Sequence, residues 1–407
     1  MSVQFQQTTL DNGLTIIAEV KDSAHTAACG FFVKTGTRDE PLELLGVSHF
    51  LEHMMFKGTA RRTADQVNID FDRIGANYNA ATSQEATYFW AHVLPEYLDS
   101  AVDLLADILR PSLRGTDFDM EKNVILEEIG MYRDRPFWVA YEQAMERFCG
   151  EHPLGYRILG TPESITALKR DQMAGYFDQR YSADNIVVAL SGRLDFDRVV
   201  DQIGKLCGQW QHTGAKRDYT PVKPLEAEQT IAQAKLKRHY VVCLTPGPSR
   251  QDESRYAASV LANVLGDDDG SRLYWKLIDP GLADEAELSY QPCDQFGCFL
   301  SYASCDPKRS AEVEAALGEV MATAADNLDD AEVERSRSKI AMDLMLHNEQ
   351  PAGRMMALGS SWLYTGEYRP MEEELHRIEQ VNADGLRRFI KDWPFAPRTT
   401  IRLTPGE

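Results

Sequence analysis

The pentad His49-Phe50-Leu51-Glu52-His53 constrains this 407-residue chain more than any other feature of its sequence. Residues four apart lie on one face of an α-helix, so His49 and His53 can contact one metal ion together. Glu52 precedes the second histidine and is placed to act on a water bound to that metal. The surrounding residues 46–58 are largely apolar, and polar side chains in an apolar helix need partners. The plainer alternative is a helix with two half-buried, hydrogen-bonded histidines and a solvated glutamate.

The order His-x-x-Glu-His is the inverzincin pattern of metal hydrolases, in which a catalytic zinc has three protein ligands and an open position for water. A third ligand is therefore expected elsewhere, and the acidic segment 117–128 is the best candidate. On a helix, Glu121 and Glu128 share a face, whereas Glu127 points about 100° away. We predict Glu128 as the third ligand and Glu121 as a carboxylate that orients a ligating histidine. The alternative is a solvated acidic helix face.

Several short segments follow one another through the N-terminal half of the chain. They are residues 10–14 (LDNGL), 36–40 (GTRDE), 49–59 (HFLEHMMFKGT), 79–83 (NAATS), the acidic segment 121–128, and 152–163 (HPLG, then GTPE). In this order they resemble the pitrilysin/insulinase superfamily of zinc peptidases. Within it, the resemblance is to the mitochondrial processing peptidase and its bacterial relatives of similar length. The C-terminal half resembles the superfamily only in its general pattern.

The resemblance implies an α+β fold of two homologous domains, each an antiparallel-rich sheet covered by helices, that pair in a clam-shell dimer. It also implies a zinc-dependent endopeptidase with one Zn²⁺ per chain and Glu52 as the general base on zinc-bound water. The segment 77–90, read as one strand, resembles the edge strand that accepts a peptide substrate by β-pairing. We expect Asn79 and Ala80 to contact the substrate backbone; the alternative is an ordinary strand.

The C-terminal half departs from the superfamily pattern. Many relatives carry an Arg and a Tyr there that bind the substrate carbonyl, and these would fall at about Ile278 and Asp284. Arg272, Tyr274 and Tyr290 are nearby but at the wrong spacing. We therefore expect a heterodimer in which a homologous subunit supplies the Arg and Tyr, with a homodimer as the second possibility.

Some superfamily members have lost catalysis and serve as peptide-binding partners or as structural core subunits of larger complexes. Such members typically lose the metal residues. Because His49, Glu52, His53 and Glu128 are all present, we favour the peptidase over this non-catalytic alternative.

Composition sets the remaining expectations. The length predicts two or more domains. We place an N-terminal zinc-bearing domain at 1–212, a polar linker at 213–230 and, as the resemblance implies, a homologous domain without a metal site at 231–407. In the last we predict a strand at 239–248 and helices at 254–265, 310–328 and 330–348. The net charge of −20 argues against nucleic acid as a partner. With no apolar stretch long enough for a membrane span and no signal peptide, we expect a cytoplasmic protein. The seven scattered cysteines are expected to be reduced core residues.

Overall fold

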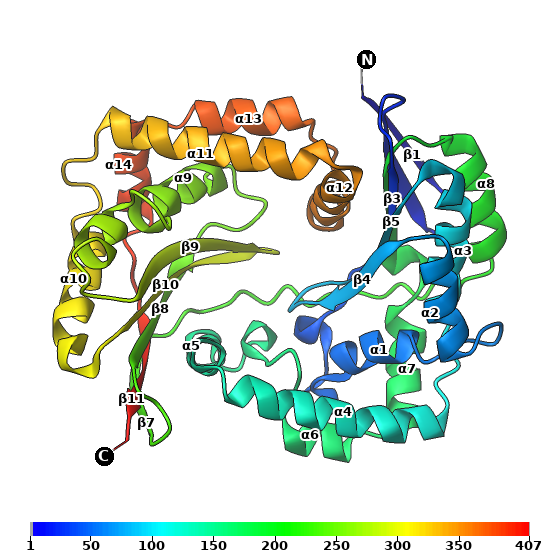
Figure 1. Ribbon diagram of the computed structural model, residues 1–407, viewed down its shortest axis with the longest axis horizontal. Helices are drawn as coiled ribbons and strands as arrows, with labels where there is room; N and C mark the ends of the chain where they lie inside the picture. Colours follow the sequence, from blue (N-terminus) through cyan, green and yellow to red (C-terminus); the bar gives the residue numbers. More distant parts are fainter. Residues whose placement is uncertain (1–2, 407) are drawn as a thin grey trace. The chain divides into compact units, whose positions relative to one another are not determined.

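The computed structural model describes residues 3–406 and contains two compact units (Figure 1). The first unit comprises residues up to 130, 156–218 and 345–368, and the second comprises 131–155, 219–344 and the residues from 369 onward. Each unit has one mainly antiparallel sheet with helices on it. The predicted α+β class is thereby confirmed, whereas the clam-shell dimer stays a prediction.

The sheet of the first unit has six strands in the order β1-β2-β6-β3-β5-β4. The strands are β1 (Gln4–Thr9), β2 (Thr15–Val20), β3 (Ala27–Val33), β4 (Asn77–Thr82), β5 (Thr87–Val93) and β6 (Ile186–Gly192). Only β2 and β6 pair in parallel. Every residue of the central strands β3 and β6 is buried, because both sheet faces are covered and both sequences are continuous apolar runs.

Helices cover both faces of this sheet (Figure 1). The helices that lie wholly or mainly in the first unit are α1 (Val47–Met55), α2 (Ala64–Arg73), α3 (Leu98–Ile108), α4 (Gly115–Arg133), α6 (Pro162–Ala167), α7 (Arg170–Arg180), α8 (Phe196–Cys207) and α12 (Pro351–Thr365). On one face, Met355 and Leu358 of α12 pack against Phe32 and Val187. The opposite face carries α3 and α8. Helix α1 contacts β4, β5 and α7, which places the pentad beside the β4 edge of the sheet.

The single strand predicted over 77–90 is wrong, because the chain turns between β4 and β5. The Ser83 amide donates to the Ala86 carbonyl, and the Ser83 hydroxyl accepts from the amides of Glu85 and Ala86. Thr82 then pairs with Thr87 at the base of the hairpin. A serine that satisfies the turn amides with its own side chain favours this reversal over a continuous strand.

The second unit has a five-stranded sheet in the order β7-β11-β8-β10-β9, with only β7 and β11 parallel. Its strands are β7 (Ala227–Gln233), β8 (His239–Gly247), β9 (Glu285–Cys293), β10 (Phe296–Cys305) and β11 (Thr399–Pro405). Its helices are α5 (Pro136–Cys149), α9 (Arg255–Gly266), α10 (Ser310–Ala322), α11 (Asp330–Glu349), α13 (Met371–Glu379) and α14 (Ala383–Asp392).

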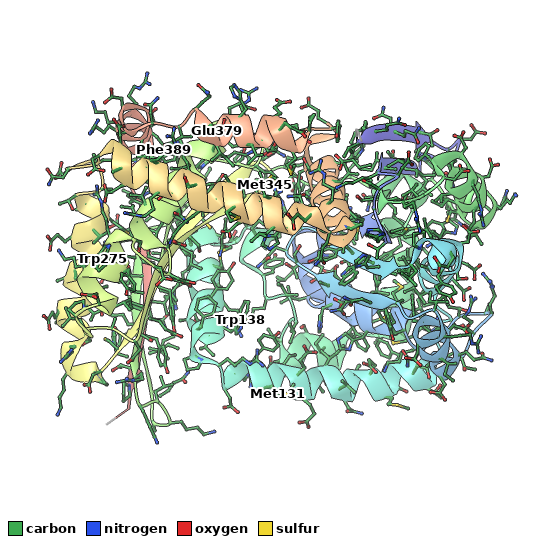
Figure 2. All side chains as sticks on the ribbon, turned by 45° about the horizontal axis from the view of Figure 1, so that its top comes forward. Met131, Trp138, Trp275, Met345, Glu379 and Phe389 are labelled. Carbon is green, nitrogen blue, oxygen red and sulfur yellow. The ribbon has the colours of Figure 1, made fainter. Side chains whose placement is uncertain are left out.

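The alternation of side chains along β8 and β10 divides the core of the second unit between the two faces of its sheet. Val241 and Phe299 pack with α9 and α14, whereas Val242 and Leu300 pack with α5. Phe389 of α14 belongs to the first of these clusters, while Trp275 is an exposed side chain (Figure 2).

The predicted C-terminal elements agree with the structure within two residues at each end, except for the helix predicted at 310–328. Helix α10 ends at Ala322, and turns continue to Asn327, whose φ of +52° is incompatible with a continuing helix. None of the helices in the described part of the chain combines the length and the apolarity that a membrane span requires.

Candidate metal centre

Helix α1 presents the pentad, and a buried carboxylate holds its N-terminus. The helix begins after Gly46, whose φ of +91° suits glycine. The two carboxylate oxygens of Glu40 accept hydrogen bonds from the amides of Gly46 and Ser48, each at 2.7 Å. These amides would otherwise lack partners at the start of the helix. The helix dipole and these hydrogen bonds favour an anion there, but burial outweighs them and raises the pKa of Glu40 to about 7.

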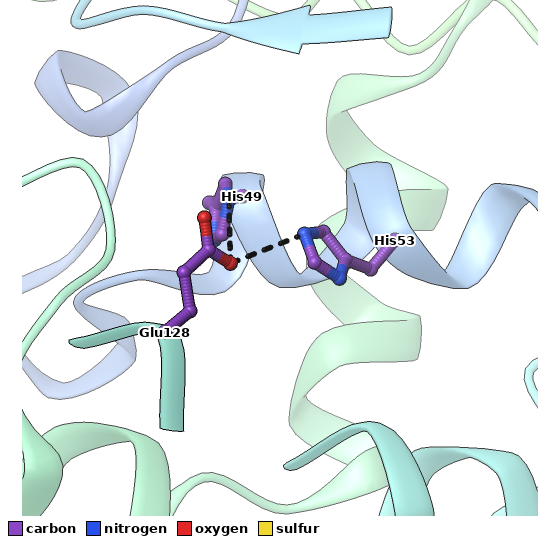
Figure 3. Close-up of side chains that lie close together, drawn as sticks. All are labelled: His49, His53 and Glu128. Carbon is purple, nitrogen blue, oxygen red and sulfur yellow. Dashed lines mark ion pairs between the residues drawn. The ribbon is translucent and has the colours of Figure 1, made fainter. Parts of the chain in front are cut away.

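Three predicted ligands converge in the first unit (Figure 3). The Oε2 atom of Glu128 on α4 lies 3.7 Å from His49 Nε2 and 3.6 Å from His53 Nε2. All three ligand atoms lie within 4.8 Å of one another. Tetrahedral zinc with bonds of about 2.0–2.2 Å places its ligand atoms roughly 3.3–3.6 Å apart. The cluster therefore fits one Zn²⁺ after small side-chain movements. Glu127, the neighbour of Glu128, is exposed.

Burial keeps His49 neutral. The buried environment, with His53 beside it, lowers the pKa of His49 from 6.5 to about 3. A neutral imidazole is the form that binds a metal ion. Among the residues that the structure describes, none forms a hydrogen bond with the buried Nδ1 atom of His49. Its Nε2 atom is the nitrogen that faces Glu128.

A carboxylate and a lysine orient His53. Its Nδ1 atom lies 2.8 Å from Glu121 Oε1, and Lys57 Nζ lies 2.6 Å from Glu121 Oε2. Burial alone would raise the pKa of Glu121, but His53 and Lys57 outweigh it and hold that pKa below its usual range. The ionised Glu121 favours a proton on Nδ1, which leaves Nε2 free to face Glu128.

Glu52, one residue before His53, is held by strand β4. The Thr82 hydroxyl donates a hydrogen bond of 2.7 Å to Glu52 Oε2. Burial raises the pKa of Glu52, although the Thr82 hydrogen bond opposes this. A raised pKa suits a carboxylate that must take up and release a proton near neutral pH.

The predicted substrate-contact residues lie on an edge strand. In the described structure, β4 has a neighbouring strand only on the β5 side. Asn79 is exposed and Ala80 is buried, and the Ala80 amide donates to the side-chain oxygen of Asn79 at 2.9 Å. The amide of Ala80 is therefore not used in the β4–β5 ladder. It can donate its hydrogen bond to another acceptor in place of the Asn79 side chain.

Three residues of the site were not singled out from the sequence. Lys57 follows His53 by one helical turn, so the i, i+4 spacing alone could have placed it next to the same partner. Thr82 shares a strand face with Ala80 by the two-residue period. Glu40 had no comparable signal, because its contact with the helix N-terminus depends on the path of the intervening loop.

The residues near the expected Arg and Tyr positions form structural contacts within the second unit. Ile278 packs against the core, and Asp284 forms an ion pair with Arg238. Arg272 is paired with Glu332 at 2.8 Å, and the Tyr290 hydroxyl donates to the Pro248 carbonyl at 2.8 Å.

Comparisons with known proteins agree with this architecture. Residues 15–162 match the family described as insulinase (peptidase family M16), and residues 167–340 match the peptidase M16 inactive domain. An uncharacterized zinc protease of Mycobacterium leprae is 32% identical over 385 residues, which cover 93% of this chain and 86% of that protein. One from Bacillus subtilis is 31% identical over 397 residues, covering 95% and 96%.

Solved structures show the same fold. A protease from Helicobacter pylori superposes with a TM-score of 0.92 at 20% identity, covering 99% of this chain and 100% of that one. A chain of complex III2 from Candida albicans superposes with a TM-score of 0.84 at 17% identity, covering 98% and 95%. With sequence relatives matched over nearly its whole length, the chain belongs to the insulinase family of M16 peptidases.

Proposed function

We propose that this chain is a zinc-dependent endopeptidase that cleaves extended or unfolded peptides. The observation that carries the proposal is that His49, His53 and Glu128 converge on one point. Glu52 lies on helix α1 together with the two histidines. Two imidazoles and one carboxylate are the donor set of several catalytic zinc sites. The family relatives named as zinc proteases support the same metal, and we propose one Zn²⁺ per chain.

A bound Zn²⁺ would polarise the scissile carbonyl and lower the pKa of an attacking water. Glu52 accepts a proton from that water and later passes a proton to the leaving amine. The Thr82 hydroxyl holds one oxygen of Glu52, which leaves the other oxygen for proton transfer. Glu121 and Lys57 keep the Nε2 lone pair of His53 directed into the ligand cluster.

The substrate is proposed to pair with the outer edge of β4. Such pairing uses backbone groups and is largely independent of side-chain identity, which suits varied peptides. An incoming strand would take the Ala80 amide from the Asn79 side chain, the acceptor that it has in this structure.

The alternative is a non-catalytic peptide-binding or structural subunit. The likeness to a complex III2 chain, at 17% identity, concerns the fold alone. The complete ligand set and the hydrogen-bonded Glu52 favour the peptidase, because a purely structural subunit has no need of either.

We further propose that a homologous subunit supplies the Arg and Tyr, with a homodimer as the second possibility. In support, Arg272 and Tyr290 are engaged within their own unit. We propose the cytoplasm as the location, supported by the buried thiols of Cys29, Cys207 and Cys298, because cytosolic proteins keep their cysteines reduced.

The direct test combines zinc content with cleavage of an unfolded polypeptide, measured with and without a chelator and with any homologous subunit present. We expect about one zinc per chain and loss of cleavage on chelation. Glu52→Gln should keep its zinc and lose roughly 10²–10⁴-fold in kcat. Glu127→Gln, an exposed glutamate beside a ligand, is the matched control and should behave as the wild type. Full activity of Glu52→Gln would refute the base, and chelator-resistant cleavage would refute the zinc.

A further inference from the structure

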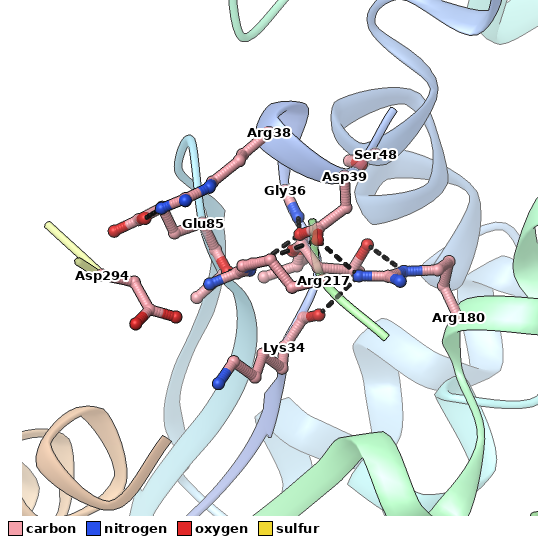
Figure 4. Close-up of polar contacts among 12 residues, drawn as sticks. Lys34, Gly36, Arg38, Asp39, Ser48, Glu85, Arg180, Arg217 and Asp294 are labelled. Carbon is pink, nitrogen blue, oxygen red and sulfur yellow. Dashed lines mark hydrogen bonds and ion pairs between the residues drawn. The ribbon is translucent and has the colours of Figure 1, made fainter. Parts of the chain in front are cut away.

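The first part of the predicted linker forms hydrogen bonds with other residues of the first unit. The amides of Thr213 and Gly214 donate to Asp184, and the Lys216 carbonyl accepts from Arg180 at 2.9 Å. The deepest contact is made by Arg217. Its side chain is 1% exposed and forms two hydrogen bonds with the equally buried Asp39, at 3.0 Å and 2.7 Å (Figure 4).

Arg217 joins two segments that shape the metal centre. Asp39 adjoins Glu40, which holds the N-terminus of α1. The guanidinium also donates to the carbonyl of Glu85, in the turn that follows Thr82. Arg217 therefore connects the segment before the metal-binding helix with the end of the strand that holds Glu52.

The same two segments approach closely at other points. The Arg38 amide donates to the Gln84 carbonyl at 2.8 Å, and the Arg38 side chain forms a buried ion pair of 2.7 Å with Glu85. A Cβ on Gly36 would lie only 2.3 Å from the Ser83 carbonyl oxygen. The turn after β4 is thus packed directly onto residues 36–40. Arg217, which lies in the linker, forms hydrogen bonds with both segments.

We propose that Arg217 is a positioning residue for the active site: it holds the turn after β4 against residues 36–40 and so keeps the Thr82 hydroxyl on Glu52. In this proposal the linker helps to position catalytic groups and also connects the two units. The inference rests on the proposed peptidase function. A planar guanidinium can bind a carboxylate through two nitrogens and still donate to a carbonyl, whereas a lysine ammonium cannot reproduce this geometry.

The competing explanation is that Arg217 serves only stability, as many buried ion pairs do. The chain offers a matched control in the same unit. Arg354 of α12 forms a buried two-point ion pair with Glu19 of β2, with both contacts at 2.5 Å. Strand β2 is separated from β4 by three strands in the order of the sheet, so this pair lies away from the metal centre at the β4 edge.

The experiment compares Arg217→Lys with Arg354→Lys in the full chain, assayed with the homologous subunit if activity requires one. Both variants should lose thermal stability. Only Arg217→Lys should lose kcat, by roughly 10–100-fold, as expected for a misplaced catalytic group. Its zinc dissociation constant should stay within about threefold of the wild type, because no metal ligand is touched. Its KM should stay within about twofold, because β4 keeps its pairing with β5.

Hydrogen exchange supplies a readout that is independent of activity. In Arg217→Lys, the amides of Glu85 and Ala86 should exchange faster than in the wild type, and in Arg354→Lys they should not. If Arg217→Lys does not fold, Asp39→Asn weakens the same contact from the other side, together with the ion pair between Asp39 and Arg180. The amides of Glu85 and Ala86 should again exchange faster than in the wild type.

Equal kcat values for the two lysine variants at equal folded fraction, or unchanged exchange in the turn, would overturn the positioning role. If the wild-type protein cleaves no peptide at all, the proposed function fails, and the exchange measurement alone decides whether Arg217 holds the turn.

Discussion

The three proposed ligands differ in how burial affects their protonation. Burial, together with His53, lowers the pKa of His49 to about 3, whereas burial raises the pKa of Glu128. Burial alone would lower the pKa of His53, but Glu121 and Glu128 outweigh it and raise that pKa. A divalent cation would displace the protons that this cluster retains, so zinc affinity should increase with pH.

The lowered pKa of His49 predicts how the stability of the metal-free protein depends on pH. Below pH 6.5 the unfolded state protonates this histidine, whereas the folded state does not until about pH 3. The unfolded state then binds more protons, so stability falls as the pH is lowered through this window. Well below pH 6, His49 should lower the free energy of unfolding by about 1.4 kcal/mol for each pH unit. We expect His49→Gln to remove this contribution. Urea unfolding between pH 4.5 and 8 in a chelator measures the difference.

The exposed His25 provides the control. His25→Gln should leave the pH dependence of unfolding as it is in the wild type. Parallel stability curves for the wild type and His49→Gln would show that burial does not keep His49 neutral.

At the scale of elements, the centre depends on how α1, α4 and β4 are held together. Helix α1 carries two of the proposed ligands and the proposed base, α4 carries Glu128 and Glu121, and β4 carries Thr82. The polar contacts between these elements form in a buried or half-buried setting, and Phe50 of α1 also stacks on Phe118 of α4. The orientation of α1 is therefore critical, and Glu40 fixes its first turn.

We expect Glu40→Gln to destabilise the protein by about 1–3 kcal/mol, because an amide group offers one acceptor oxygen where two buried amides need one each. It should also weaken zinc binding, since the helix that carries His49 and His53 loses an anchor. Urea unfolding and competition with a chelator measure the two effects.

Glu43→Gln, an exposed glutamate three residues later, is the matched control and should change stability by less than about 0.5 kcal/mol. A Glu40→Gln protein as stable as this control would exclude the anchoring role of Glu40.

At the scale of the whole molecule, the compact units are interleaved in the sequence. Residues 131–155, with α5, belong to the second unit, and residues 345–368, with α12, belong to the first. The division at 1–212, 213–230 and 231–407 stays a proposal about homologous halves. Two residues near the expected donor positions, Arg272 and Tyr290, are engaged in contacts within the second unit.

If a partner supplies those donors, the isolated chain should be nearly inactive. Adding a homologous subunit should raise kcat by about 10²-fold or more, the usual effect of one transition-state donor. Light scattering should then show a particle of about twice the 45.9 kDa of this chain. Full activity from a monomer would refute the need for a partner, and an active homodimer would support the second possibility.

Much of the site could be predicted because its rules are local. The i, i+4 spacing brings His49 and His53 together, and helical phase separates Glu128 from the exposed Glu127. The apolar run at 239–248 likewise predicts the strand β8. The turn at 83–86 was missed because Ser83 satisfies the amides of the turn, a side-chain effect that the apolar pattern does not show.

By itself, the sequence determined the types and the spacing of the candidate ligands and the face of α4 that carries the third one, because these follow from the geometry of a single helix. Only the tertiary structure decided that Glu40 anchors α1, that Thr82 holds Glu52 and that Arg217 ties the linker to both segments. These contacts join residues far apart in the chain, so they depend on how sheets and helices pack, which no local period encodes.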